Sequence, residues 1–427
     1  MKVLVVGGGG REHAIIRKLK ESPKITELYA APGNAGIGFD AVCVPIKATD
    51  VEAIAAWAKE NRMDYVVVAP DDPLAMGLVD LLEENGIPAF GPNKKAAVIE
   101  ASKAFSKELM KKYHIPTARY ETFSDVEKAK AYLNACGTWP MVLKADGLAL
   151  GKGVLICQSK AEALTAIEEM MVGGKFGASG NTVVIEEFLT GPEVSVLSFT
   201  DGETVVPMVS SMDHKRALDG DKGLNTGGMG TVAPNPYYTP EIARRCMEEI
   251  FLPTVKAMKA EGRPFKGCLY FGLMLTPDGP KVIEYNCRFG DPETQVVLPL
   301  LETDLLTVME AVTQGRLKEI NVIFSPRHAA CVVLASGGYP EHYEKGKPIT
   351  GLVNGQLPST EATVYHAGTA LKDGTLVTAG GRVLGVTATG DTLKEALDKA
   401  YAAAGQISFD GLHKRSDIGA KALAAKP

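Results

Sequence analysis

The chain has 427 residues, of which 45% are hydrophobic and 23% charged, as expected for a soluble globular protein of about three domains. Its formal net charge of −5 argues against a nucleic-acid-binding surface and against polybasic contact with a membrane. We expect neither a signal peptide nor a membrane-spanning helix, because no apolar run reaches about 18 residues. Seven cysteines are scattered singly, which favours free thiols in a reducing cytoplasm over disulfides or a zinc site.

The first hundred residues predict alternating strands and helices. Strands are expected over residues 3–6, 27–31, 41–44 and 65–69, and helices over 11–20, 51–60 and 74–84. Apolar strands that alternate with helices indicate a parallel sheet covered by helices. We therefore predict an α/β protein whose N-terminal, Rossmann-like domain spans residues 1–102.

The rest of the chain predicts two further domains. A charged helix over 94–112 leads into a domain over 103–325 made of two α+β subdomains, of which the smaller, a lid, covers about 116–190. We expect a strand–hairpin–strand unit over 142–157, strands over 182–188, 193–200 and 203–209, a helix over 240–260 and a hairpin over 268–286. A small mixed α/β domain is expected over 326–427, with a helix over 393–404 and a frayed tail after residue 420.

The strongest chemical signal is the segment Val282-Ile-Glu-Tyr-Asn-Cys-Arg-Phe-Gly-Asp-Pro-Glu-Thr-Gln295. Its first residues predict a strand, and strand alternation places Glu284 and Asn286 on one face, about 7 Å apart. A carboxylate and an amide oxygen suit Mg²⁺ when phosphate supplies the remaining oxygens. Arg288 then offers a guanidinium suited to phosphate or carboxylate. The segment predicts a metal–nucleotide site at the end of a strand.

A glycine run, Gly7-Gly-Gly-Gly10-Arg11-Glu12-His13, follows the first predicted strand and opens a helix. Its N–H groups and the helix dipole suit one phosphate group, and a tight turn without a ligand stays the alternative. A dinucleotide fingerprint does not fit, because Glu12 and His13 break every Gly-x-Gly-x-x-Gly register. Loops 32–36 and 70–73 follow neighbouring strands, so the three loops together favour a phosphosugar pocket.

Other segments indicate binding of a nucleotide and of a zwitterion. Lys144 precedes a glycine-rich hairpin over 146–153, which is either a lid over phosphates or a plain β-hairpin. Residues 186–189 end a strand and suit an adenine edge, unless they are only an acidic strand end. Asp213-His-Lys-Arg216 and the glycines of 225–230 suit a zwitterion such as an amino acid, while His214 is interpreted as structural.

Taken in order, these motifs resemble the ATP-grasp ligases and, among them, the glycinamide ribonucleotide synthetase family. The resemblance runs from Gly9 to Val383, and its most specific parts are residues 225–230 and 284–295. It implies ATP-dependent ligation of glycine to 5-phosphoribosylamine through glycyl phosphate, a step of purine biosynthesis. It also implies a cytoplasmic protein, which we expect to be a monomer without nucleic-acid or membrane partners.

The resemblance further implies a role for each candidate residue. Glu284 and Asn286 would bind Mg²⁺ or Mn²⁺, and Arg288, Asp213 and Lys144 would take part in catalysis. The expected ATP-binding residues are Lys103, Lys144, Gly147, Gly151, Lys152, Gly153, Glu186, Glu187, Phe188, Leu189 and Glu193. Those expected around glycine or phosphoribosylamine are Gly9, Gly10, Asn34, Asp72, Asp213, Gly228, Arg288 and Asp291.

The sequence departs from the family's pattern at two places. It has Pro70-Asp71-Asp72-Pro73 where Pro-Glu-x-Pro is expected, so either acid could contact the sugar. The strand over 270–275 carries no acid, so a second metal would depend on Glu284 and on ATP itself.

Rival hypotheses concern other functions. The first alternative is another ATP-grasp carboxylate–amine ligase of nucleotide metabolism. A nicotinamide-dependent oxidoreductase is more distant, because the glycine fingerprint is broken. An adaptor protein would leave the charged glycine clusters at strand ends unexplained.

Overall fold

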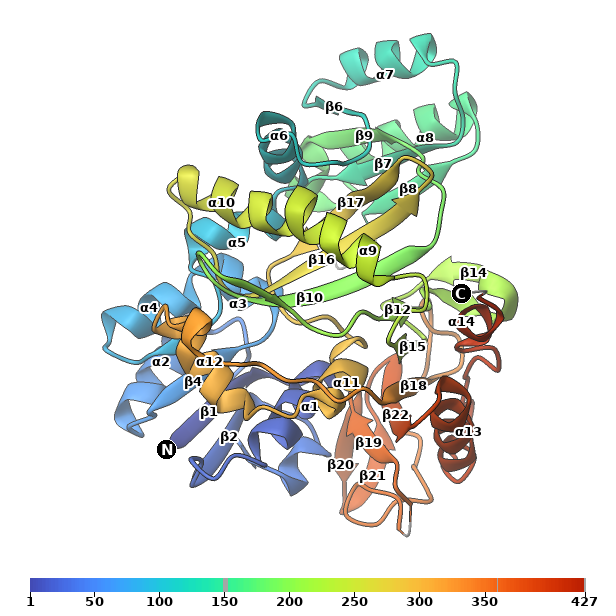
Figure 1. The fold of residues 1–427 in the computed structure, drawn as a ribbon. Coiled ribbons are helices and arrows are strands. Elements are labelled where there is room, and N and C mark those ends of the chain that lie inside the picture. The colour runs from blue at the N-terminus through green and yellow to red at the C-terminus, as the bar shows by residue number, and fades with distance from the viewer. Residues whose placement is uncertain (149–152, 359, 426–427) are drawn as a thin grey trace.

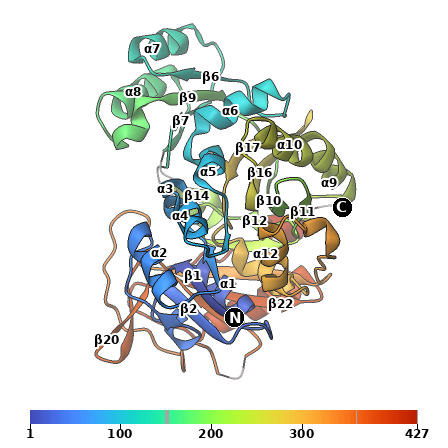
Figure 2. The same cartoon turned by 90° about the vertical axis from the view of Figure 1, so that its left-hand side faces the viewer.

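A computed structural model describes residues 1–148, 153–358 and 360–425 of the chain. In Figure 1 the N-terminal sheet lies at the lower left, most of the described residues after 327 lie at the lower right, and the described residues between 120 and 187 form a layer at the top. A central antiparallel sheet runs between these parts, and the turned view in Figure 2 again shows the upper layer standing apart from the lower two. The central sheet is therefore the element to which the other parts attach.

The N-terminal region is a parallel sheet with the strand order β3-β2-β1-β4-β5. Its central strands are apolar and buried, as parallel strands covered by helices on both faces must be. The predicted parallel sheet is confirmed. Its elements are β1 (Lys2–Gly7), α1 (Gly10–Leu19), β2 (Glu27–Pro32), β3 (Val42–Cys43), α2 (Val51–Glu60), β4 (Tyr65–Val68), α3 (Asp71–Met76), α4 (Leu78–Glu84) and β5 (Ala89–Phe90).

Two helices that the sequence predicts as continuous are each divided in two. Gly77, at φ +90°, separates α3 from α4, because a glycine adopts this left-handed conformation without steric cost. Ser102 is extended and its hydroxyl accepts a hydrogen bond from the N–H of Phe105 at 3.1 Å. It therefore ends α5 (Lys94–Ala101) and caps α6 (Lys103–Lys112). The predictions of single helices over 74–84 and 94–112 were wrong.

The upper layer is an antiparallel sheet with the strand order β6-β9-β7-β8, packed against two helices. Strands β7 and β8 pair from Met141↔Cys157 to Lys144↔Val154, so the predicted hairpin is confirmed. Residues 149–152 of its connection lie outside the described residues. The elements are β6 (Tyr120–Phe123), α7 (Val126–Ala135), β7 (Met141–Ala145), β8 (Val154–Cys157), α8 (Lys160–Met171) and β9 (Val183–Glu187).

The central sheet has the strand order β11-β10-β16-β17. Strand β11 is shorter than the predicted span 203–209, and the helix predicted over 240–260 passes through a π-helical turn at Met247–Phe251. Phe251 from this turn packs on Phe271, with ring centroids 4.3 Å apart, and fixes the helix on the sheet. The elements are β10 (Glu193–Asp201), β11 (Val205–Pro207), α9 (Pro240–Cys246), α10 (Leu252–Ala260), β16 (Lys266–Thr276), β17 (Gly279–Asn286), α11 (Thr294–Val297) and α12 (Leu305–Thr313).

The C-terminal sheet has the strand order β12-β15-β18-β22-β19 and includes two strands from residues 212–233. These strands come from the span predicted as the second domain, so the last two predicted domains share a sheet. The tail was expected to fray after residue 420, but Ala422 is buried in a short helix, so this prediction was wrong for 420–424. The elements are β12 (Met212–Asp213), β13 (Arg216–Leu218), β14 (Lys222–Asn225), β15 (Gly230–Ala233), β18 (His328–Ala335), β19 (Thr363–His366), β20 (Thr369–Lys372), β21 (Thr375–Thr378), β22 (Arg382–Gly390), α13 (Leu393–Ala404) and α14 (Ala420–Ala424).

Short 3₁₀ helices complete the described chain, at Ile37–Phe39, Gly177–Asn181, Asp219–Asp221, Leu298–Leu300 and Leu317–Glu319. Across the ranges that the structure describes, none of the helices combines the length and the apolar character needed to cross a membrane.

Candidate active site

A β-bulge in β17 sets the direction of the predicted metal ligands. Leu273 pairs with Val282 and the preceding residue, Gly272, pairs with Glu284, so Ile283 has no partner in the ladder. Val282 and Tyr285 are buried in the core, whereas Glu284 and Asn286 reach the other face. Simple alternation would place Val282 and Glu284 on the same face. The extra residue therefore turns Glu284 out of the core and toward a pocket.

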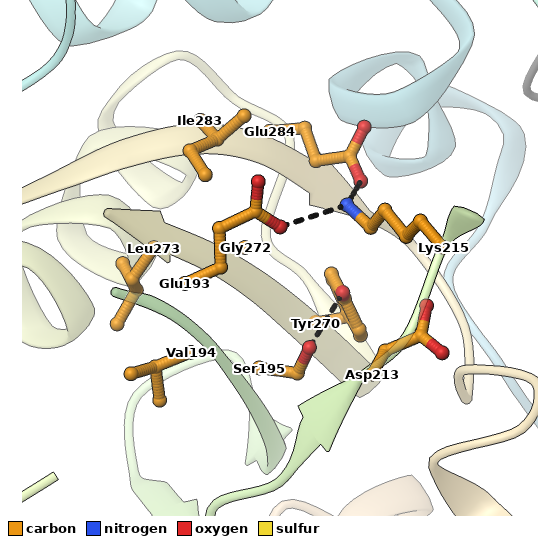
Figure 3. A pocket seen from close by; sticks show the side chains of 10 residues that line it. All are labelled: Glu193, Val194, Ser195, Asp213, Lys215, Tyr270, Gly272, Leu273, Ile283 and Glu284. Atoms are coloured by element: carbon orange, nitrogen blue, oxygen red, sulfur yellow. Dashed lines mark hydrogen bonds and ion pairs between the residues drawn. The ribbon is translucent and has the colours of Figure 1, made fainter. Parts of the chain in front are cut away.

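Figure 3 shows this pocket, which lies between β10, β12, β16 and β17. The ammonium of Lys215 lies 3.4 Å from the carboxylate of Glu193 and 4.0 Å from that of Glu284. Burial opposes ionisation of Glu284, but the charges of Lys215 and Lys144 outweigh it and lower its pKa. The pocket thus holds an ionised carboxylate among cations. It is lined by Glu193, Val194, Ser195, Asp213, Lys215, Tyr270, Gly272, Leu273, Ile283 and Glu284.

The amide of Asn286 fits a cation when it is oriented by its neighbours. Only with its nitrogen turned toward two acceptors does the amide make hydrogen bonds, to the carbonyl of Tyr285 at 3.2 Å and the carboxylate of Glu100 at 2.9 Å. We assign this orientation from the neighbours, and it leaves the amide oxygen on the opposite side. Among the described residues there is no group of three or more His, Cys, Asp or Glu side chains that could hold a metal alone. Glu284 and Asn286 therefore fit a hard cation that takes its other oxygens from phosphate.

Two buried lysines meet on Glu186 at the base of the lid. Its carboxylate lies 3.1 Å from the ammonium groups of both Lys107 and Lys144. Lys144 also donates to the carbonyl of Ile283 at 3.0 Å, so the lid is tied to the bulge in β17. Burial lowers the pKa of Lys107 to about 8, although the charge of Glu186 opposes this. The ammonium of Lys144 is therefore held in place by Glu186 and the Ile283 carbonyl, and it could bind a phosphate without reorganising.

The other residues predicted for ATP lie around the same strands. Glu187 pairs with Arg119 at 2.8 Å, Phe188 is exposed, and Glu193 lines the pocket. Leu189 is half-buried beside Phe188. Gly153 directly precedes β8, whereas Gly151 and Lys152 lie outside the described residues.

Lys103 ties the start of α6 to the first residues of the glycine-rich hairpin. Its ammonium donates to the carbonyl of Gly147 at 2.8 Å, and the Asp146 carboxylate accepts from the N–H of Ala104 at 3.2 Å. Burial lowers the pKa of Lys103, while the charge of Glu284 raises it. Lys103 therefore lies close enough to Glu284, a predicted metal ligand, for the two charges to interact.

Buried acids gather on the opposite side of the pocket. Burial and the charge of Glu293 raise the pKa of Asp213 well above its usual value. Glu293 accepts a hydrogen bond from the hydroxyl of Tyr270 at 3.2 Å. Arg288 pairs with Glu100 at 2.9 Å, and the charges of Glu100 and Asp71 raise the pKa of Arg288 against the effect of burial. This side can bind a positively charged amine beside a fixed guanidinium.

The N-terminal glycine loop contacts the segment that follows β17, the strand with the predicted metal ligands. Gly9 is the N-cap of α1, and its N–H donates to the carboxylate of Glu12 at 2.7 Å. The N–H of Arg11, directly after Gly10, donates to the carboxylate of Asp291 at 3.3 Å. The predicted phosphosugar loop and the 284–295 segment therefore form one continuous surface.

Two residues predicted for the sugar have different surroundings. The amide nitrogen of Asn34 donates to the carbonyls of Gly8 and His366, at 2.9 and 2.8 Å, so it joins the glycine loop to the C-terminal sheet. Asp72 is half-buried in the first turn of α3, where burial and the charge of Asp71 raise its pKa. The charge of Asp71 raises the pKa of Arg288, which places Asp71 near the site.

The chain matches the models of three successive domains of one protein family. They are phosphoribosylglycinamide synthetase N domain over residues 1–100, ATP-grasp (A) domain over 101–294 and C domain over 329–421. The chain belongs to the phosphoribosylglycinamide synthetase family. Relatives called phosphoribosylamine–glycine ligase include one from Caldanaerobacter subterraneus, 50% identical over 98% of this chain and 100% of the relative. Another, from Rhodopirellula baltica, is 50% identical over 99% of this chain and 98% of the relative.

Solved structures agree with this family. The crystal structure of phosphoribosylamine–glycine ligase from Thermotoga maritima has a TM-score of 0.86 and 37% identity, covering 98% of this chain and 100% of that one. A biotin carboxylase domain from Hydrogenobacter thermophilus has a TM-score of 0.74 at 20% identity, covers 97% and 91% of the two chains, and shows the fold alone. This phosphoribosylglycinamide synthetase family member is an ATP-dependent ligase, and the predicted fold class is confirmed.

Sequence reasoning missed several charged residues of this phosphoribosylglycinamide synthetase site. Lys215 belongs to the cluster 213–216, and Lys107 lies one helical turn after Lys103, so each had a local signal. Arg382 follows two glycines, while Glu100 has no distinctive sequence around it. His214 is structural as predicted: its Nδ1 donates to the carbonyl of Gly230 at 3.0 Å, and its Nε2 accepts from the N–H of Gly419 at 3.1 Å.

Proposed function

We propose that this protein performs the ATP-dependent ligation of glycine to 5-phosphoribosylamine, giving glycinamide ribonucleotide, ADP and phosphate in purine biosynthesis. ATP phosphorylates the glycine carboxylate, and the amine of the sugar then attacks glycyl phosphate and displaces phosphate. The contact between Arg11 and Asp291 carries this proposal, because it joins the predicted phosphosugar loop to the strand end with the predicted metal ligands.

On the nucleotide side, Lys144 and Lys103 bind phosphates, together with the glycine-rich hairpin that contains Gly147, Gly151, Lys152 and Gly153. Support comes from the positions of both lysines: each is held by a backbone carbonyl and lies within electrostatic reach of Glu284. The adenosine then lies along residues 186–189 and Glu193, at the edge of the pocket. Because Glu186 is buried between two lysines, its role there is to orient Lys144.

Glu284 and Asn286 hold Mg²⁺, and Mn²⁺ is a chemically equivalent choice for these oxygen ligands. A metal held there would supply positive charge that neutralises the phosphates. The protein's own part is to keep Glu284 ionised through nearby lysines and to fix the Asn286 amide through Glu100.

On the acyl side, Asp213, Gly228, Arg288 and Asp291 surround glycine and its phosphorylated carboxylate. The raised pKa of Asp213 reflects a buried acid that gains from a cationic amine beside it. Arg288, held by Glu100, stabilises charge that develops on the transferred phosphoryl group. Gly9, Gly10, Asn34 and Asp72 face the sugar, with Asp71 as the neighbouring acid.

We further propose that the chain divides into domains over 1–102, 103–325 and 326–427, with a lid at about 116–190. The protein acts as a cytoplasmic monomer on small-molecule substrates. No nucleic acid or membrane is required by this chemistry.

ADP formation tests the proposed function. Mg·ATP is supplied with glycine and freshly generated phosphoribosylamine, separately and together, and product is identified by mass. Turnover that requires both substrates supports the proposal. ADP formation that depends on a different carboxylate or amine would contradict it and favour another ATP-grasp ligase.

A further inference from the structure

Arg382 is a half-buried cation that the C-terminal sheet extends toward the acyl side of the pocket. It is the first residue of β22, and one nitrogen of its guanidinium, Nη1, makes two hydrogen bonds to backbone. Nη1 donates to the carbonyl of Gly227 at 2.8 Å and to the carbonyl of Asp291 at 3.0 Å. The same nitrogen lies 3.5 Å from the carboxylate of Asp291. One side chain therefore joins two loops that are more than sixty residues apart in sequence.

The loop that Arg382 holds has no room for larger residues. A Cβ atom at Gly227 would lie 2.8 Å from Cζ of Arg382. Gly228 adopts φ +122°, and a Cβ there would lie 2.6 Å from the carboxylate of Asp213 and 2.5 Å from Pro292. The N–H of Gly227 donates to the hydroxyl of Tyr339 at 3.0 Å. Two residues of the C-terminal region therefore hydrogen-bond to Gly227: Arg382 to its carbonyl and Tyr339 to its N–H.

The charges around Arg382 agree with this geometry. Burial opposes its charge, but the carboxylates of Asp291 and Asp213 raise its pKa above the usual value. In return, Arg382 and Arg11 keep the pKa of Asp291 low, although partial burial of that acid acts to raise it. Arg382 is thus the cation between the two acids proposed to surround glycine.

We propose that Arg382 is a positioning residue for the amino-acid substrate, which it serves by holding the Gly227–Gly228 turn against Asp213 and fixing the backbone of Asp291. This inference rests on the proposed function, since it assigns Arg382 to the glycine side of that same site. A planar guanidinium has several N–H donors and can contact two carbonyls and a carboxylate at the same time. A lysine ammonium keeps the positive charge but lacks this planar arrangement of donors.

The test compares R382Q and R382K with R327Q, whose arginine makes an exposed pair with Asp391 in the same C-terminal region. Initial rates are measured with glycine and ATP varied separately, the Mg·ATP dissociation constant is measured by calorimetry, and thermal midpoints are recorded. R382Q is expected to lower kcat/KM for glycine about 10- to 100-fold, the effect of losing a charged hydrogen bond, with R382K intermediate. The Mg·ATP dissociation constant is expected to stay within about twofold of wild type, because Arg382 makes no contact on the nucleotide side of the described pocket.

A double-mutant cycle with Y339F separates positioning from general stability. Arg382 and Tyr339 act on the same residue, so their effects on kcat/KM for glycine are expected to be non-additive. Additive effects, or equal losses in the glycine and Mg·ATP constants with a lowered thermal midpoint, would overturn the inference. So would an R382Q enzyme that matches R327Q in every constant. A wild-type enzyme that makes no product from glycine and phosphoribosylamine would instead contradict the proposed function itself.

Discussion

Lys144 donates a hydrogen bond to the carbonyl of Ile283, the residue that the bulge in β17 leaves without a ladder partner. The nitrogen–oxygen distance is 3.0 Å, and the same ammonium pairs with Glu186. The irregularity that turns Glu284 toward the pocket thus also provides an acceptor for the proposed phosphate-binding lysine. The side chain of Lys144 therefore connects the lid to β17, the strand with the predicted metal ligands.

This contact predicts that K144M weakens Mg·ATP binding about 10- to 100-fold, the effect of losing a charge-assisted hydrogen bond to phosphate. Lys107 continues to pair with Glu186, so the fold is expected to persist. Isothermal titration with Mg·ATP measures the change. K130M in the same lid removes exposed pairs with Glu127 and Glu168 and should bind like wild type. Wild-type affinity in K144M would show that Lys144 is only structural.

Glu284→Gln removes the negative charge and keeps the shape of the proposed metal ligand. The Mg²⁺ concentration needed for half-maximal ATP binding is expected to rise at least about tenfold, because an amide is a weaker ligand for a hard cation. The thermal midpoint should change little, since this side chain lies at the pocket and not in the core. E203Q alters an exposed pair with Lys259 and serves as the control. An unchanged Mg²⁺ requirement in E284Q would refute the assignment.

Gly36 is predicted to be intolerant of any side chain. A Cβ there would lie 1.9 Å from Cγ of the His366 ring, at the contact between the N-terminal loop and the C-terminal sheet. G36A should lower stability by about 3 kcal/mol, at the upper end for overpacking, and thermal denaturation measures this. G137A, where an added Cβ meets nothing within 4 Å, is the matched control. If the clash is the cause, G36A and H366A will be less than additive.

Buried histidines predict a loss of stability in acid. Burial lowers the pKa of His366 to about 4, against the opposing effect of the Gly355 carbonyl, while an unfolded histidine titrates near 6.5. The unfolded chain therefore binds the proton first, so the stability is complete above about pH 6.5 and is lost as pH falls toward 4. Between pH 7 and pH 5 the loss is about 2 kcal/mol for this group.

Urea midpoints at the two pH values test this prediction. H366N should be less stable at pH 7 but should show a smaller drop between pH 7 and pH 5 than wild type. His214, whose pKa burial also lowers to about 4, accounts for part of the remaining drop. H342N, at an exposed position, should keep the wild-type pH dependence. An unchanged drop in H366N would contradict the role of His366.

Local patterns in the sequence were enough to predict much of the fold. The helices over 51–60 and 393–404 begin and end where their apolar spacing and their Asp50 and Thr392 caps place them. Helix breaks at Gly77 and Ser102 were missed, because a single residue's φ value or cap overrode a continuous helical pattern. The strands β12 and β15 were also missed as part of the C-terminal sheet. The pairing of β15 with β18 joins residues about one hundred positions apart, and β12 joins the sheet only through β15.

By itself, the sequence determined which chemical groups the protein offers: the Glu284–Asn286 pair, the lysines before and within the glycine hairpin, and the glycine loops at strand ends. These signals are local, so spacing along the chain reveals them. Only the tertiary structure decided where those groups point and what completes them. The bulge at Ile283 reverses the face of Glu284, and Arg382, Lys107 and Glu100 reach the site through contacts between distant segments. Such contacts depend on how the elements pack, and no periodicity in the sequence encodes them.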